Sequence, residues 1–158
     1  MEIKHTNLQR GFTLIELLIA VTIIAIITSI ALPSYRDYII RSNRAAAVAD
    51  LLEMSHWMER QFTIFGRYND SSMSSLPVSQ SPKTGDASYN LSISESAATT
   101  YIITATPVGA QINDTQCGSL STNHASVECI KVGTGSTSCS NDPNAANRAT
   151  VRKCVGGS

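Results

Sequence analysis

The sequence predicts an α+β fold in which a long N-terminal helix packs on a small antiparallel β-sheet, followed by a cysteine-rich C-terminal region. Three observations support this prediction. Residues 12–32 are almost entirely apolar, helical periodicity continues over residues 33–65, and short alternating segments follow between residues 89 and 132. A chain of 158 residues is long enough for one modest domain with an appendage.

The apolar segment, residues 12–32, carries a single charged side chain, Glu16. As a helix it would be about 30 Å long, which is the thickness of the hydrocarbon core of a bilayer. Lys4 and Arg10 precede it, so the positive-inside rule places the N-terminus in the cytoplasm and the rest of the chain outside. A cleaved secretory signal ending near residues 29–31 is the alternative, but Glu16 and the helical pattern beyond this point oppose it.

Residues 33–65 predict an amphipathic continuation of the same helix. One face is mostly apolar and the opposite face is charged, at the spacing of an α-helix. The expected apolar stripe is Val48, Leu51, Leu52, Ser55, Met58 and Phe62, and the expected charged face is Arg44, Asp50, Glu53, Glu59 and Arg60. Pro33 should kink this helix rather than end it, because the pattern resumes beyond it, and Gly66 is a natural C-terminal stop.

The composition changes after Gly66. Residues 67–88 form a polar loop with two prolines. Strands are then predicted at residues 89–94, 100–106, 117–122 and 127–132, and their alternation favours an antiparallel meander with one face covered by the helix. Residues 133–158 are rich in Gly, Ser, Thr and Asn, and only disulfides are expected to order them.

All the cysteines of the chain lie in its C-terminal part: Cys117, Cys129, Cys139 and Cys154. Their even number and loose spacing are typical of disulfides formed in an oxidising compartment. A zinc site is disfavoured, because the sequence has no C-x-x-C pair and His124 is the only histidine nearby. We therefore expect neither a metal nor any other cofactor.

The strand pattern narrows the disulfide pairing. A hairpin through residues 123–126 that sets Leu120 opposite Cys129 leaves Cys117 about 10 Å along the strand from the partner position of Cys129. A disulfide needs Cα atoms within about 7 Å, so a 117–129 bridge is disfavoured. Two pairings stay open: 117–139 with 129–154, which is slightly preferred, and 117–154 with 129–139.

Charge and motif content limit the function classes. The 12 Lys and Arg residues balance the 12 Asp and Glu residues, so the whole chain has no polyanion-binding character. The C-terminal part is locally basic, and its basic residues beyond Ile130 are Lys131, Arg148, Arg152 and Lys153. No nucleophile elbow, matched His/Asp pattern, phosphate loop or dinucleotide fingerprint is found, so no catalytic residue is expected and the protein is not expected to be an enzyme.

Glu16 requires an explanation, because a carboxylate in hydrocarbon costs about 2.5–3.5 kcal/mol. If the chain is cut after Gly11, Phe12 becomes the N-terminal residue and its amino group is positively charged. Glu16 then lies in the first helical turn, where a negative charge favours the helix dipole. In a bundle of identical helices, Glu16 of one copy would meet the Phe12 amine of a neighbour and set the register between them.

The stretch "RGFTLIELLIAVTIIAIITSIALPSYRDY", residues 10–38, resembles the N-terminal signature of type IV prepilins. The resemblance implies that a prepilin peptidase removes residues 1–11 as a leader and methylates the amine of Phe12. It also implies that an inner-membrane assembly platform builds the subunits into an extracellular pilus, with the apolar helices as its core. Residues 33–158 would be the globular head, with the pilin fold's αβ-loop at 67–88, a sheet at about 89–132 and a disulfide-bounded region at 133–158.

Two further stretches, "MERQFTIFGRYND" and "TATPVGAQINDTQCGSLS", are similar to the PilE-like group of minor pilins. The four cysteines and the stretch "GSTSCSND" resemble ComP-like competence pilins, which display a DNA-uptake receptor surface, although the spacing from Cys129 to Cys139 is longer than in that pattern. The resemblance implies a minor pilus subunit that supports adhesion, motility and DNA uptake. Lys131, Arg148, Arg152 and Lys153 are then the candidate phosphate contacts. The alternatives are a type II secretion pseudopilin and an adhesive major pilin.

Overall fold

The structure is a computed structural model that describes residues 12–131, 133, 137–139 and 145–155. The chain divides into two compact units, Met1–Tyr38 and Ile39–Ser158. Helix α1 (Leu14–Phe65) contributes to both units and continues without a break through Pro33. The kink expected at Pro33 stays a prediction. The helix ends where Gly66 adopts a φ of +68° and donates its backbone N–H to the carbonyl of Phe62 at 2.8 Å.

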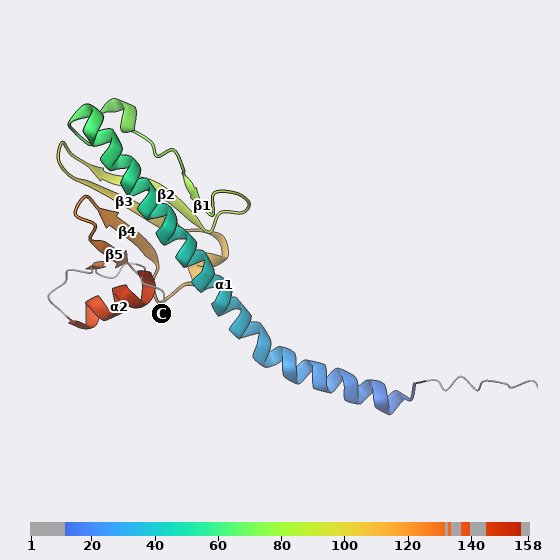
Figure 1. The fold of residues 1–158 in the computed structure, drawn as a ribbon. Coiled ribbons are helices and arrows are strands. Elements are labelled where there is room, and N and C mark those ends of the chain that lie inside the picture. Colours follow the sequence, from blue (N-terminus) through green and yellow to red (C-terminus); the bar gives the residue numbers. More distant parts are fainter. Residues whose placement is uncertain (1–11, 132, 134–136, 140–144, 156–158) are drawn as a thin grey trace, which may run out of the picture. The chain divides into compact units, whose positions relative to one another are not determined.

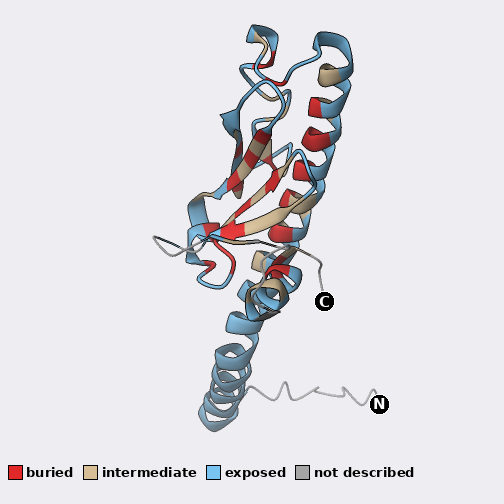
Figure 2. Ribbon diagram, turned by 90° about the vertical axis from the view of Figure 1, so that its left-hand side faces the viewer, coloured by how far each residue is buried: buried red, intermediate tan, exposed pale blue. Residues whose placement is uncertain are grey.

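The described part of the first unit is helical and fully exposed. Every residue from Phe12 to Tyr38 is exposed, as the long run of exposed helix in Figure 2 shows. Among the described residues, α1 is the one helix long and apolar enough to span a membrane. Thr22, Thr28 and Ser29 donate their hydroxyls back to helix carbonyls at 2.7–2.8 Å. These polar groups are therefore satisfied within the helix itself, as a nonpolar environment requires.

The described residues of the second unit form a six-stranded antiparallel sheet in the order β1-β2-β3-β4-β5-β6, so each strand pairs with its neighbour in the chain. The strands are β1 (Gln80–Ser81), β2 (Tyr89–Ser96), β3 (Tyr101–Pro107), β4 (Ser119–Asn123), β5 (Glu128–Lys131) and β6 (Thr137–Cys139). Two short 3-10 helices, η1 (Ser71–Met73) and η2 (Gly109–Asn113), lie in the connections, and helix α2 (Ala145–Val155) follows the sheet. The four segments predicted as strands correspond to β2–β5, and the predicted α+β class is confirmed.

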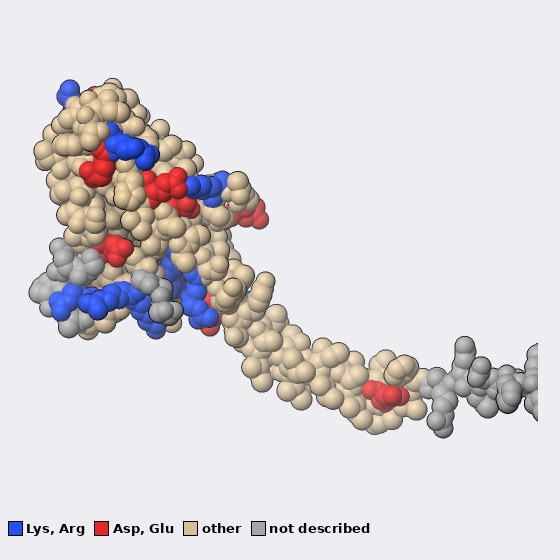
Figure 3. Space-filling model, in the orientation of Figure 1, with Lys and Arg blue, Asp and Glu red and all other residues tan. Residues whose placement is uncertain are grey.

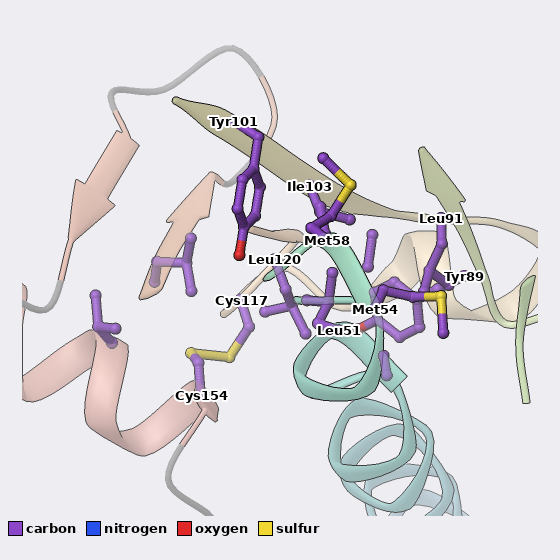
Figure 4. Packing of buried hydrophobic residues seen from close by; sticks show 14 of the residues in the cluster. Leu51, Met54, Met58, Tyr89, Leu91, Tyr101, Ile103, Cys117, Leu120 and Cys154 are labelled. Atoms are coloured by element: carbon purple, nitrogen blue, oxygen red, sulfur yellow. A yellow bond between two sulfur atoms is a disulfide. The ribbon is translucent and has the colours of Figure 1, made fainter. Parts of the chain in front are cut away.

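The core lies between α1 and one face of the sheet. Alternate residues of the strands point towards the helix, as the period of a half-buried strand requires. Figure 4 shows side chains of β2, β3 and β4 meeting the buried side of α1. The largest contributors are Met54 and Met58 from α1, Tyr89 and Leu91 from β2, Tyr101 and Ile103 from β3, and Leu120 from β4.

Two details of the predicted helix are wrong. The helical pattern puts Arg44 and Asp50 on the solvent face, but both are buried, because each faces an opposite charge from elsewhere in the unit. Arg44 pairs with Asp114 at 2.7 Å, and Asp50 lies 3.8 Å from Lys83 of the polar loop. Leu52, expected in the apolar stripe, is 49% exposed. The buried side of α1 is therefore rotated relative to the predicted stripe.

The register of the β4–β5 hairpin is shifted by one residue from the prediction. Leu120 lies opposite Ile130, and Ser121 lies opposite Cys129. The turn is longer than predicted because the side chain of Asn123 accepts the backbone N–H groups of Ala125 and Val127, at 3.0 and 2.9 Å. Such an Asn-centred turn holds residues 124–127 outside the ladder.

Candidate functional site

Helix α2 gathers three of the basic residues that the sequence singles out. Val151 and Cys154 of this helix are buried in the common core. Arg152 and Lys153, in the last turn, are exposed, and Arg148, one turn earlier, is partly exposed. Three alanines favour the helix, and its buried residues follow helical spacing. The sequence does not predict this helix in the region after residue 132, where only disulfides are expected to give order.

The basic side chains of α2 form a local concentration of positive charge. In Figure 3, Lys and Arg atoms gather at the lower left, over the position that α2 occupies in Figure 1. α2 packs against β5 and β6. Lys131 is exposed at the end of β5, but its neighbour Ile130 points into the core, so strand alternation directs Lys131 to the opposite face of the sheet. The structure thus brings Arg148, Arg152 and Lys153 together and separates Lys131 from them.

A disulfide joins α2 to the segment just before β4. The sulfur atoms of Cys117 and Cys154 are 2.01 Å apart, the Cα atoms are 5.7 Å apart, and both residues are buried. The preferred pairing of Cys117 with Cys139 and of Cys129 with Cys154 is therefore wrong. The reason is α2 itself, whose last turn places Cys154 against Cys117. Cys129 is disulfide-bonded and lies opposite Cys139 in the β5–β6 register, but the side chain of Cys139 lies outside the described residues.

A buried polar network holds the segment that leads into Cys117. Gln111 of η2 donates to the hydroxyl of Tyr89 at 2.9 Å and accepts from Asn43 of α1 at 3.3 Å. One oxygen of Asp114 accepts the guanidinium of Arg44, and its other oxygen accepts the backbone N–H of Cys117 at 3.1 Å. Sequence reasoning missed this network, because nothing local in the sequence pairs residues so far apart.

The start of α1 shows how Glu16 is placed. Its backbone N–H donates to the side-chain oxygen of Thr13 at 3.3 Å. Thr13 and Glu16 have the S/T-x-x-E spacing of a capping box, which satisfies a free N–H at a helix start. This spacing is the sequence signal that could have predicted the cap. Gly11 lies outside the described residues, and Phe12 is exposed.

No group of His, Cys, Asp and Glu in the described residues is arranged to hold a metal ion. The polar side chains buried in the second unit instead pair with one another. Arg44 forms an ion pair with Asp114, and the hydroxyls of Ser55 and Tyr101 are hydrogen-bonded. The candidate binding surface is the exposed basic side of α2, with Arg152 and Lys153 in its last turn.

Family models match most of the chain. Residues 33–121 match the model described as "Type IV minor pilin ComP, DNA uptake sequence receptor". Residues 6–32 match the model described as "Prokaryotic N-terminal methylation motif". The first match covers more than half of the sequence, and it ends before α2, the helix that carries the basic side chains.

Curated relatives match over a shorter segment. The chain is 51% identical over 57 residues to a fimbrial protein of Moraxella nonliquefaciens, covering 35% of this chain and 37% of that protein. It is 53% identical over 45 residues to fimbrial protein Q of Moraxella bovis, covering 28% of this chain and 29% of that protein. The chain thus spans about a third of the length of these relatives.

Two solved structures are similar at lower identity. The non-core minor pilin PilV of Neisseria meningitidis has a TM-score of 0.47 at 14% identity, covering 63% of this chain and 93% of PilV. A type IV pilin from Shewanella oneidensis has a TM-score of 0.42 at 23% identity, covering 61% of this chain and 98% of that pilin.

Proposed function

Because the chain belongs to the family described as type IV minor pilin ComP, DNA uptake sequence receptor, we propose that it is a minor pilus subunit. We propose further that it binds double-stranded DNA through α2. The observation that carries this proposal is the grouping of Arg148, Arg152 and Lys153 on one helix. Cationic side chains that meet phosphates release condensed counterions, and this release supplies most of the non-specific affinity for DNA. The disulfide at Cys154 holds this helix to the segment before β4, and the helix packs against β5 and β6, so the cations are presented by a fixed scaffold.

Basic residues in the last turn of a helix also stabilise it, because they face the negative end of its dipole. This ordinary role would account for Arg152 and Lys153 without any ligand. The two roles make different predictions. A purely structural role predicts that neutral variants lower helix stability without changing the salt dependence of any DNA complex.

The apolar half of α1 supports assembly of the subunit from a membrane into a filament. The leader, residues 1–11, is removed by a prepilin peptidase between Gly11 and Phe12, and the new Phe12 amine is methylated. The match to the N-terminal methylation motif over residues 6–32 supports this step. Before assembly the helix spans the inner membrane with its N-terminus in the cytoplasm. In the pilus, other pilin subunits cover the same apolar surface, and an inner-membrane platform carries out the transfer.

The test measures DNA binding by the full processed chain in detergent micelles, using fluorescence anisotropy of a labelled duplex at several salt concentrations. The variant is Arg152→Gln/Lys153→Gln. We expect weaker binding and a shallower slope of log K against log salt, by about 0.9 for each phosphate that the variant no longer neutralises. The matched control is Arg41→Gln/Arg60→Gln, which removes two exposed positive charges from α1 and should change the slope little. Absence of binding by the wild-type chain, or equal losses of affinity in both variants, would contradict the proposal.

A structural role in the filament is a second candidate function, because the curated matches, over 57 and 43 residues, are to fimbrial proteins. The competing classes are an adhesive major pilin and a type II secretion pseudopilin. A gene deletion scored for pili, transformation and protein secretion separates them. Loss of transformation with intact pili supports the DNA receptor, loss of pili supports a structural subunit, and loss of secretion alone supports the pseudopilin.

A further inference from the structure

A receptor for a DNA sequence has to contact base edges, because contacts to phosphates carry no direct sequence information. The basic side chains of α2 supply phosphate contacts. Beside this helix lies a pocket that is largely apolar, unlike the basic surface of α2. This pocket is a candidate for the contact to a base edge. The inference therefore rests on the proposed function.

The pocket lies between α1, the β4–β5 hairpin and the end of α2, all within the second unit. It is a partly open hollow of about 40 Å³. Its apolar part includes Val48 and Leu52 of α1, Leu120 of β4 and Val155, the last residue of α2. Its polar part includes Thr122 and Glu128 of the hairpin.

The size of the pocket limits what it can hold. A volume of this size accepts a water-sized or methyl-sized group and not a whole base or a small-molecule cofactor. The half-exposed Leu52 stands at its edge and is accessible from outside. A small apolar group that projects from a larger partner is therefore the occupant that fits.

The surroundings of the pocket indicate which partner carries that group. Arg152 precedes Val155 by three residues, so the two are neighbours on the surface of α2. A partner that binds at the pocket therefore lies within one helical turn of the positive charge of Arg152. The carboxylate of Glu128 at the pocket disfavours a phosphate inside it. Glu128 is only partly exposed, so this side of the hollow is partly shielded from water, and this burial raises the pKa of its carboxyl.

We propose that this pocket receives the 5-methyl group of a thymine while the adjacent turn of α2 contacts the DNA backbone. The thymine methyl is an apolar group that projects from an anionic polymer into the major groove, and apolar side chains contact it there. The pocket is a specificity site, in which methyl burial distinguishes thymine from cytosine. The phosphate contacts of Arg152 and Lys153 provide affinity for any sequence.

The test removes the methyl group alone. Duplexes are enriched from a random-sequence library on the full processed chain in detergent micelles, and each thymine of an enriched duplex is replaced in turn by deoxyuridine. We expect one replacement to lower affinity about fourfold, the effect of one buried methyl-sized group. The same replacement should have little effect with Leu52→Ala, which removes a wall of the pocket. Ile64→Ala is the matched control, because Ile64 is an exposed apolar residue of α1, 69% exposed, that does not line the pocket.

The outcomes separate this inference from the proposed function. If every deoxyuridine duplex binds as tightly as its parent, or if the loss of affinity is the same in wild type and Leu52→Ala, the pocket inference is overturned while salt-dependent DNA binding stands. The same holds if Leu52→Ala reduces filament assembly without altering the thymine effect, because the pocket then contacts another subunit. If the wild-type chain binds no duplex, both proposals fail.

Discussion

Arg44 of α1 and Asp114, which follows η2, form a buried ion pair in which two guanidinium nitrogens contact the same carboxylate oxygen. The Nη2–Oδ2 distance is 2.7 Å and the Nε–Oδ2 distance is 3.1 Å. The other oxygen of Asp114 accepts the backbone N–H of Cys117. A single carboxylate therefore connects the long helix to the residue whose disulfide holds α2.

Removing one partner of this pair should destabilise the second unit strongly. In Arg44→Met or Asp114→Asn, the remaining group is left buried without its counter-charge, at a cost of about 3–5 kcal/mol. The double variant Arg44→Met/Asp114→Asn should be destabilised less, because no uncompensated charge remains and the amide oxygen still accepts the backbone N–H of Cys117. Urea unfolding of the full chain in micelles, followed by the fluorescence of Trp57, measures both effects. A double variant as unstable as the sum of the single variants would show that the pair is not coupled.

The Cys117–Cys154 disulfide should stabilise the fold mainly through the unfolded chain. For a sequence separation of 37, the loop-entropy model gives about 4 kcal/mol. The variant Cys117→Ala/Cys154→Ala should therefore unfold at a lower urea concentration than the oxidised wild type. Peptide mapping of the unreduced protein should recover residues 117 and 154 in one linked pair. A linked pair of residues 117 and 139 would contradict the structure.

The sequence predicts α1 and the strands β2–β5 because their side chains repeat at the period of a helix or a half-buried strand. It misses α2 because few of its residues are strongly apolar, and its inward residues, Val151 and Cys154, find their partners only in the folded sheet. The strands β1 and β6 are two and three residues long, which is too short for alternation to show. The periodicity of the sequence therefore does not predict how the C-terminal region folds.

Tertiary contacts account for the errors at the candidate site. A charged residue in a helical pattern is normally placed outside, and Arg44 is buried only because Asp114 meets it from 70 positions away. The basic residues near the C-terminus are visible as a group in the sequence. The sequence does not show that Lys131 lies on the opposite face of the sheet from the basic residues of α2. This placement follows from Ile130, which points into the core. The pocket between α1 and the hairpin likewise exists only in three dimensions.

Glu16 should be required for assembly rather than for folding of the head. In Glu16→Gln the shape of the side chain and the Thr13 cap remain, but the charge that would pair with a neighbouring Phe12 amine is removed. We expect fewer pili in sheared fractions while the amount of membrane-bound subunit stays constant. Asp37→Asn, an exposed acidic residue of the same helix, is the control and should assemble normally. Normal piliation of Glu16→Gln would rule out the register hypothesis.

Processing should leave Phe12 at the N-terminus of the extracellular subunit. Mass spectrometry of sheared filaments is expected to identify an N-terminal peptide that begins at Phe12 and carries one methyl group. Replacing Gly11 by a bulky residue should leave the leader attached and keep the subunit in the membrane. An extracellular form that begins at Leu32 would instead indicate cleavage by a signal peptidase, and it would contradict the filament model.

The tyrosines of the core should make stability fall at alkaline pH. Burial, assisted by the hydrogen bond to Glu59, raises the pKa of Tyr68 to about 12, and burial raises the pKa of Tyr101 to about 12 as well. In the unfolded chain a tyrosine titrates near pH 10. Between these values the unfolded state loses the proton first, so the free energy of unfolding decreases as pH rises from about 10 to about 12.

Tyr68→Phe should make this decrease shallower, whereas Tyr38→Phe, at an exposed position, should leave it unchanged. Urea unfolding at several alkaline pH values measures the slope, and an identical slope in wild type and Tyr68→Phe would contradict the assignment.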